Sequence, residues 1–94
     1  GIENLMKLVA NVTKYPEDAW KQKAEGRVIL RFVVDEEGKM THPQILQSVR
    51  YDIDKEAIRA FEAIADVYLW SPGYQDGEAK RVKFTIPLYF RIPK

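Results

Sequence analysis

The residues whose types could support chemistry are few, and they gather around one predicted hairpin. His42 is the single histidine of the 94-residue chain, and Asp35, Glu36 and Glu37 precede it across a loop. A metal site needs three or four converging ligands and a general base needs an oriented partner, whereas loop carboxylates of this kind are usually solvated. The chain has no cysteine, so thiolate ligands and disulfides are excluded. We therefore expect no catalytic residue, no metal site and no cofactor.

Nucleotide phosphates and single-stranded RNA are the other ligands to consider. Gly73 and Gly77 stand in a turn before a strand rather than at a helix N-terminus, so they make no phosphate cradle. Small sheet domains can bind single-stranded RNA through basic and aromatic residues on an open face. The residues that would do so here are Arg31, Lys83, Tyr89 and Arg91. Because a net charge of +1 is too small to drive general binding to nucleic acid, we expect no nucleic-acid partner and keep RNA as the alternative from a different functional class.

Length and composition place these residues on one small globular domain. With 46% hydrophobic and 31% charged residues, the 94-residue chain is expected to form a single domain with a thin core. We divide it into an N-terminal helix and lead-in, residues 1–14, and a core, residues 15–92. No apolar stretch approaches the length of about 20 residues that a membrane-spanning helix needs. Since the chain opens at Gly1 without a methionine, we expect it to be part of a longer protein.

Three helices are predicted from apolar spacing and capping residues. The first has apolar residues at helical spacing, namely Ile2, Leu5, Met6 and Val9, and Asn11 is expected to end it. A second opens at Tyr15-Pro16 and ends before Gly26. A third is expected to begin after Asp54 as its N-cap. The buried stripe of this third helix is Ala57, Ile58, Phe61, Ile64 and Ala65.

Three strands are predicted from alternation. Residues 27–35 alternate with β-branched residues throughout, and a loop at 35–39 returns the chain into a second strand over 40–49. The spacing of Met40, Pro43 and Ile45 indicates a bulge in that second strand. Residues 66–80 are expected to be an irregular loop in which Trp70 covers the core. The last strand has the clearest alternation, with Val82, Phe84, Ile86, Leu88, Phe90 and Ile92 on one face.

The prolines predict the order of the strands. Proline is confined to edges or bulges, and Pro43 and Pro87 lie in the second and third strands while residues 27–35 contain none. The first strand is therefore central, and we predict an α+β fold with a three-stranded antiparallel sheet in the order 2-1-3 and helices packed on one face. The third strand is then a long free edge, which invites pairing with another chain.

The free edge is also the basic part of the chain. Residues 78–94 hold five basic residues against Glu78, a local charge of +4. The candidate partner-strand edge consists of residues that share one bonding direction, namely Arg81, Lys83, Thr85, Tyr89 and Arg91. The pattern leaves two interpretations open: charge that only discourages aggregation, or a site of strand addition at which the flanking cations favour an acidic partner. Exchange of the strand into a homodimer is a further use of such an edge.

An ordered set of residues resembles the C-terminal domain of TonB-type energy transducers. The first half of the set is Tyr15-Pro16, Ala19, Gly26, Val28, Phe32-Val33-Val34-Asp35 and Gly38. The second half is Asp54, Glu56-Ala57, Trp70-Ser71-Pro72-Gly73, Gly77, Val82, Ile86-Pro87 and Phe90. The resemblance covers residues 15–92, and the lead-in helix of residues 1–14 is similar to the Bacteroidetes-type version of the family.

The resemblance implies a function that does not follow from the composition. Members are periplasmic domains, anchored through an upstream region to the inner membrane of a Gram-negative bacterium and coupled there to a proton-driven motor complex. They capture a peptide of an outer-membrane transporter, which adds as a strand to the edge of the last strand. The segment before Tyr-Pro also meets the transporter, which here implies Asn11, Val12, Thr13 and Lys14. A TonB-like or TolA-like interaction domain of a periplasmic signalling protein is the related alternative.

Trp20 departs from the pattern of the family. A polar or small residue is more usual at this position of the second helix, and tryptophan is enriched among the residues that dominate binding interfaces. Trp20 is therefore the candidate surface anchor, with packing over a thin core as the competing interpretation.

Overall fold

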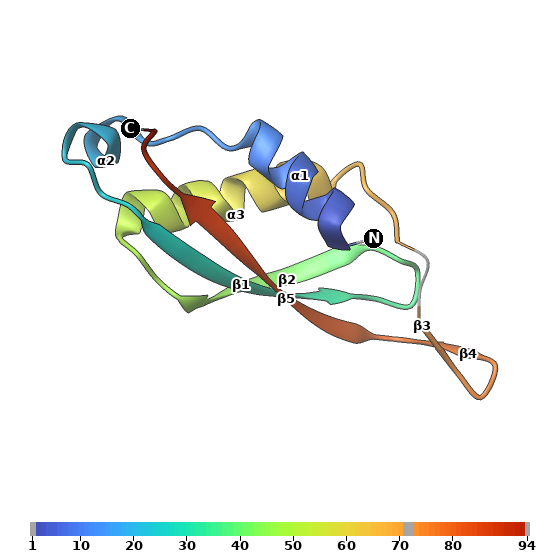
Figure 1. The fold of residues 1–94 in the computed structure, drawn as a ribbon. Helices are drawn as coiled ribbons and strands as arrows, with labels where there is room; N and C mark the ends of the chain where they lie inside the picture. The colour runs from blue at the N-terminus through green and yellow to red at the C-terminus, as the bar shows by residue number, and fades with distance from the viewer. Residues whose placement is uncertain (1, 71–72, 94) are drawn as a thin grey trace.

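Helices cover one face of a small antiparallel sheet (Figure 1). The computed structural model describes residues 2–70 and 73–93. The helices are α1 (Ile2–Val12), α2 (Glu17–Lys21) and α3 (Tyr51–Ala65). The strands are β1 (Gly26–Val34), β2 (Met40–Gln47), β3 (Gly73–Gln75), β4 (Glu78–Lys80) and β5 (Val82–Phe90).

The main sheet has the order β2-β1-β5, with both pairs antiparallel, which confirms the predicted arrangement. The pairing of β1 with β5 runs without interruption from Gly26 opposite Phe90 to Val34 opposite Val82. Even-numbered residues of both strands face the helices, and odd-numbered residues form an open face that no helix covers. Alternation in the sequence therefore predicted the core face correctly.

The pairing of β1 with β2 contains the expected irregularity. The register shifts twice, once between Ile29 and Leu30 and once between Arg31 and Val33, so β2 carries an extra residue at each place. One shift coincides with His42, whose φ of 54° is unusual for a residue other than glycine. Bulges with one extra residue leave room for Pro43, which has no N–H to donate to β1.

The core is formed by the inner residues of β1 and β5 under α1 and α3. Its largest fully buried side chains are Phe32, Phe61, Leu5, Leu30, Ile53, Ile86, Val9, Val28 and Val34. The centroids of the Phe32 and Phe61 rings lie 5.0 Å apart, which joins the sheet to α3. The contribution of Leu5 and Val9 shows that α1 is part of the core rather than an appendage.

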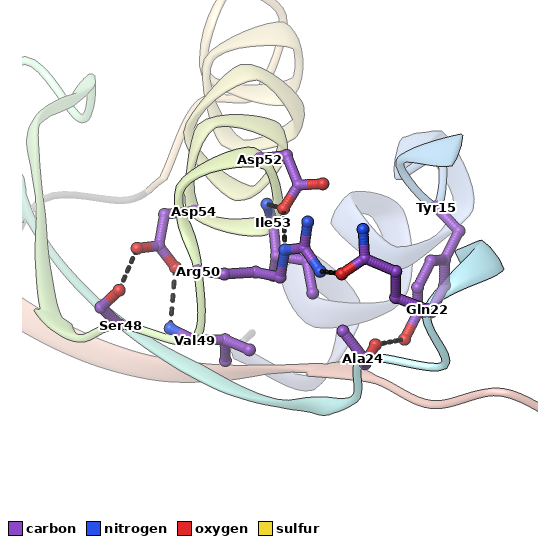
Figure 2. Close-up of polar contacts among 9 residues, drawn as sticks. All are labelled: Tyr15, Gln22, Ala24, Ser48, Val49, Arg50, Asp52, Ile53 and Asp54. Atoms are coloured by element: carbon purple, nitrogen blue, oxygen red, sulfur yellow. Dashed lines mark hydrogen bonds and ion pairs between the residues drawn. The ribbon is translucent and has the colours of Figure 1, made fainter. Parts of the chain in front are cut away.

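Helix α3 begins at Tyr51, four residues before the start predicted with Asp54 as the N-cap. Asp54 therefore does not cap the helix as an N-cap residue; the N-cap is Arg50, which makes no side-chain capping bond. The Asp54 carboxylate instead reaches back to accept hydrogen bonds from the Ser48 hydroxyl and, at 2.9 Å, from the Val49 amide (Figure 2). The prediction was wrong because Asp54 satisfies donors that precede the helix rather than donors in its first turn.

The segment between α3 and β5 is less irregular than expected. It contains a small hairpin in which β3 pairs with β4 through a two-residue turn. Asp76 and Gly77 form the turn with φ values of 53° and 80°, as an Asp-Gly hairpin turn requires. The hairpin projects from one end of the molecule, away from α2 (Figure 1). The predicted motif residues Ser71 and Pro72 lie outside the described residues.

The loop between β1 and β2 docks against the chain that leaves α3. A backbone hydrogen bond joins Gly38 and Trp70, in which the Trp70 amide donates to the Gly38 carbonyl at 2.9 Å. Gly38 has a φ of 83°, and a Cβ at this position would lie 2.0 Å from the Trp70 carbonyl oxygen. The Trp70 indole lies 4.8 Å from the Phe84 ring and donates to the Met40 sulfur, so this residue covers the core as predicted.

No helix within residues 2–70 and 73–93 has the length and apolar character needed to cross a membrane.

Candidate functional site

The outer edge of β5 is the most extended feature available for a partner. β5 pairs with β1 on one side, and no strand among the described residues pairs with its other side. The strand is nine residues long and regular, without a bulge. A long regular edge of this kind presents unpaired backbone N–H and C=O groups to any extended chain that approaches.

Pro87 indicates which residues of β5 bond outward. In an antiparallel pair, every second residue exchanges hydrogen bonds with the partner strand, and the residues between them point their N–H and C=O groups away. Pro87 lies opposite Ile29 in the uninterrupted register and has no N–H to give to β1. We assign it and the other odd-numbered residues to the outward set. Lys83, Thr85 and Tyr89 of the predicted edge therefore present their backbone groups at the free edge.

The two remaining residues of the predicted edge flank the strand. Arg81 precedes β5 and Arg91 follows it, so neither belongs to the strand itself. The Arg81 guanidinium lies 3.7 Å from a Glu36 carboxylate oxygen, whereas the Arg91 guanidinium lies over the Tyr89 ring at 5.0 Å from its centroid. Within the described part of the chain, Lys83 and Arg91 form no ion pair, so they keep the edge basic.

The predicted transporter-contact segment lies beside the C-terminal half of β5. Asn11 and Val12 form the last residues of α1, and Thr13 and Lys14 continue as extended chain. A groove of about 240 Å³ separates this chain from the strand. Its lining residues are Ala10, Thr13, Tyr15, Leu88, Tyr89, Phe90 and Arg91. The structure therefore brings Thr13 together with Tyr89 and Arg91, although about 76 residues separate them in the sequence.

Arg81 and Lys83 lie at the other end of β5, and the rise of a strand places Lys83 about 20 Å from Tyr89. They line a separate groove on the open face together with Arg31, His42 and Gln44. The His42 ring forms one hydrogen bond with a described residue, in which its Nδ1 lies 2.8 Å from the hydroxyl of the neighbouring Thr41. Among the described residues, no group of three or more metal-ligating side chains converges. The predicted edge is thus a strip along the molecule rather than one pocket.

Tyr15 lines the groove and also packs against the hydrophobic core. Its hydroxyl donates to the Ala24 carbonyl (Figure 2), and its ring packs edge-on against Phe90 at 5.6 Å between centroids. Burial raises the pKa of the Tyr15 hydroxyl, and the negative charge of Glu25 raises it further. Trp20 also packs edge-on against Tyr15, at 5.3 Å between ring centroids, and remains 48% exposed. Trp20 is therefore accessible but lies outside the groove.

Two residues of α3 that the sequence analysis did not single out as site residues hold residues 12–14 in place, the lead-in that follows α1. Glu56 accepts a 2.6 Å hydrogen bond from the Lys14 amide, and Arg59 donates a 2.7 Å bond to the Val12 carbonyl. The spacing of Glu56 and Arg59, three apart on a helix, predicts their mutual ion pair. Nothing in the sequence predicts their contacts with residues more than 40 positions away.

The fold defines a class of small α+β module in which helices cover one face of a three-stranded antiparallel sheet and the last strand lies at its edge. Comparison with known families is more specific, because residues 11–92 match the family described as Gram-negative bacterial TonB protein C-terminal. The chain therefore belongs to the family of TonB C-terminal domains. No curated protein sequence matches it.

Solved structures support the fold. A solution structure of the TonB C-terminal domain of Helicobacter pylori, residues 179–285, is similar with a TM-score of 0.80 and 16% identity, over 99% of this chain and 81% of that one. A shorter form of the same domain, residues 194–285, is similar with a TM-score of 0.71 and 17% identity, over 95% of this chain and 90% of that one. A solution structure of the TonB C-terminal domain of Pseudomonas aeruginosa is similar with a TM-score of 0.64 and 26% identity, over 87% of this chain and 80% of that one.

Membership of the family fixes the general nature of the protein. TonB C-terminal domains are non-enzymatic modules of energy transducers from Gram-negative bacteria, and they are typically periplasmic. The family implies interaction with TonB-dependent receptors. The earlier expectation of a binding module without catalytic activity agrees with this assignment.

Proposed function

We propose that this domain captures a peptide from the plug of an outer-membrane transporter as an added strand along the edge of β5 and transmits force for active uptake. The observation that carries the proposal is the free regular edge of β5, which ends at the groove bordered by Thr13. Backbone hydrogen bonds along the edge supply affinity, and side chains at the groove supply selectivity. The cations Lys83 and Arg91 favour a partner with acidic residues.

The remaining parts of the proposal concern the whole protein. Residues 1–94 act as one domain, with residues 1–14 as helix and lead-in and 15–92 as the core. An upstream region links this domain to the inner membrane and to a proton-driven motor complex. Trp20 is a second contact point for the receptor, because its exposed indole lies next to Tyr15. A Bacteroidetes-type origin remains a prediction from residues 1–14, which the full-length gene would test.

Peptide titration followed by NMR tests the proposal. Peptides from the N-terminal plug segments of candidate transporters are added to the ¹⁵N-labelled domain, and each backbone amide is followed. We expect shifts at residues 81–91 and 11–14. Saturating peptide with no shift along β5 would contradict strand capture.

Substitution of Thr85 separates backbone pairing from side-chain recognition. Thr85→Pro removes an outward N–H without disturbing the bonds to β1, so we expect a folded domain that loses peptide binding. Thr85→Ala keeps the backbone groups and should bind within about twofold of the native chain. Equal effects of the two variants would count against main-chain pairing. Circular dichroism confirms that both variants are folded.

Two alternatives remain testable. A TonB-like or TolA-like domain of a periplasmic signalling protein would carry a sensor or peptidase region upstream instead of a membrane anchor and linker. Single-stranded RNA binding would need stacking surfaces, and the Arg91 guanidinium already lies over one face of the Tyr89 ring. RNA affinity that falls steeply with salt would favour that second alternative.

A further inference from the structure

The groove beside β5 has one wall made of sheet and one made of the lead-in. The sheet wall consists of Leu88 and Phe90, which are buried in the core, together with Tyr89 and Arg91. The opposite wall consists of Ala10, Thr13 and Tyr15. Pairing with β1 holds the first wall, whereas the second wall belongs to no sheet. The width of the groove therefore depends on what holds the lead-in.

Short-range contacts fix only the two ends of this second wall. The Thr13 hydroxyl donates to the Val9 carbonyl at 2.6 Å and the Thr13 amide donates to the same carbonyl at 3.1 Å, which closes the end of α1. The Tyr15 hydroxyl bonds the Ala24 carbonyl. Residues 12–14 also include the Val12 carbonyl and the Lys14 amide, and neither has a backbone partner outside the helices among the described residues.

Helix α3 supplies both missing partners. The Arg59 Nη2 atom donates to the Val12 carbonyl at 2.7 Å, and a Glu56 carboxylate oxygen accepts from the Lys14 amide at 2.6 Å. The two side chains also bind each other, with Arg59 Nε 2.6 Å and Nη2 2.8 Å from the two Glu56 carboxylate oxygens. Bidentate pairing of this kind fixes the geometry of both groups. The Glu56 side chain is 12% exposed, so water competes poorly for it.

We propose that Glu56 and Arg59 are positioning residues for partner capture: they hold residues 12–14 as a preformed wall, so that the groove beside β5 is open to an incoming strand before it binds. This inference rests on the proposed function. Neither residue lines the groove, so each acts through the lead-in backbone and touches no partner. The wall is tied to the rigid core because Ala57 and Ala60, beside them on α3, are fully buried.

The expected effect follows from the populations of the lead-in. When only a fraction of molecules has the wall in place, the apparent dissociation constant rises by the inverse of that fraction. Loss of hydrogen bonds to charged groups changes such an equilibrium by roughly tenfold or more. We therefore expect peptide affinity to fall about tenfold when the Glu56–Arg59 pair is broken.

Matched variants on the same helix test the inference. Glu56→Gln and Arg59→Lys break the paired geometry, and Arg59→Lys keeps the charge while losing the fork that reaches both Glu56 and Val12. Glu62→Gln and Lys55→Gln are the controls, because both residues are exposed on α3 and contact no lead-in residue by hydrogen bond or ion pair. Affinity for the transporter peptide that binds the native domain is measured for all four by NMR titration, with thermal unfolding as a check of fold.

The outcomes distinguish this inference from the proposed function. Affinity that falls about tenfold in Glu56→Gln and Arg59→Lys, with native affinity in both controls, supports positioning. A second readout is faster hydrogen exchange at the Lys14 amide in the peptide-free Glu56→Gln domain. If the native domain binds at β5 and the pair variants bind equally well, the inference is overturned and the proposed function stands. If the native domain binds no peptide at β5, both are overturned.

Discussion

Gly38 is the residue at which the close approach of two loops leaves no room for a side chain. Its φ of 83° lies in the left-handed region, which disfavours any residue with a Cβ. A Cβ added at this position would also lie 2.0 Å from the Trp70 carbonyl oxygen. Gly77 has a similar φ of 80° but no atom within 4 Å of a Cβ, so it isolates the effect of φ.

We expect Gly38→Ala to lower the free energy of unfolding by about 3 kcal/mol, and Gly77→Ala by about 1 kcal/mol. The first variant suffers both strain and a displaced backbone, whereas the second suffers strain alone. Urea denaturation of the two variants measures the difference. Equal losses would show that the loop at 35–39 moves freely away from Trp70.

Glu56 should make the stability of the domain depend on pH. The hydrogen bond from Arg59 holds the pKa of the Glu56 carboxyl below its ordinary value, and the Lys14 amide contributes in the same direction. A depressed folded-state pKa gives stability that is present above the unfolded-state value of about 4.3 and is lost as the pH falls through the lower folded-state pKa.

We therefore expect the native chain to have a higher free energy of unfolding than Glu56→Gln at pH 6. The two values should converge toward pH 2.5, where the Glu56 carboxyl loses its charge. Asp35, whose pKa is also lowered, chiefly by the Lys39 amide, titrates in both proteins and cancels in the comparison. Urea denaturation across this range provides the measurement. A difference that is the same at all pH values would mean that the Glu56 charge has no part in the stability.

At the scale of elements, α1 is integral to the core. The match to the family begins only at residue 11, yet Leu5 of α1 is fully buried and packs with the rest of the core. Helix α1 contacts both α3 and β5, so it holds one end of the lead-in. Helix α1 therefore stabilises residues 12–14, the same wall of the groove beside β5 that Glu56 and Arg59 hold by hydrogen bonds.

We expect Leu5→Ala to lower the free energy of unfolding by about 3 kcal/mol, the usual loss for a buried leucine. Leu46→Ala, at a bulge of β2 where the side chain is 47% exposed, should lower it by less than about 1 kcal/mol. Thermal and urea unfolding of both variants give the comparison. A small loss at Leu5 would mean that α1 detaches readily from the core.

At the scale of the whole molecule, the domain is elongated. Its Cα radius of gyration is 14.4 Å, whereas a compact chain of this length has about 12 Å. The projecting β3–β4 hairpin accounts for part of this shape (Figure 1). The free edge of β5 raises the question of whether two copies exchange strands.

We expect a monomer without peptide, because β5 pairs along its full length with β1 of its own chain and Lys83 opposes pairing between copies. Small-angle scattering should give a radius of gyration of about 15 Å that is independent of concentration. A radius and a mass that rise together with concentration would indicate the strand-exchanged homodimer instead.

The sequence by itself determined the three strands of the main sheet, their order and the core face. Alternation in residues 82–90 fixes which side chains face the helices, since the period of a strand is two. Proline at 43 and 87 excluded both strands from the centre because proline cannot donate to a ladder. The ordered residues of the TonB type were likewise readable without a structure.

The tertiary structure alone decided how the site is assembled. The start of α3 moved to Tyr51 because Asp54 bonds Ser48 and Val49, a choice that depends on how the preceding loop folds. The β3–β4 hairpin was too short to show alternation. The contacts of Glu56 and Arg59 with residues 12–14 join segments that are distant in sequence, and only the packing of α1 against α3 brings them within hydrogen-bonding distance.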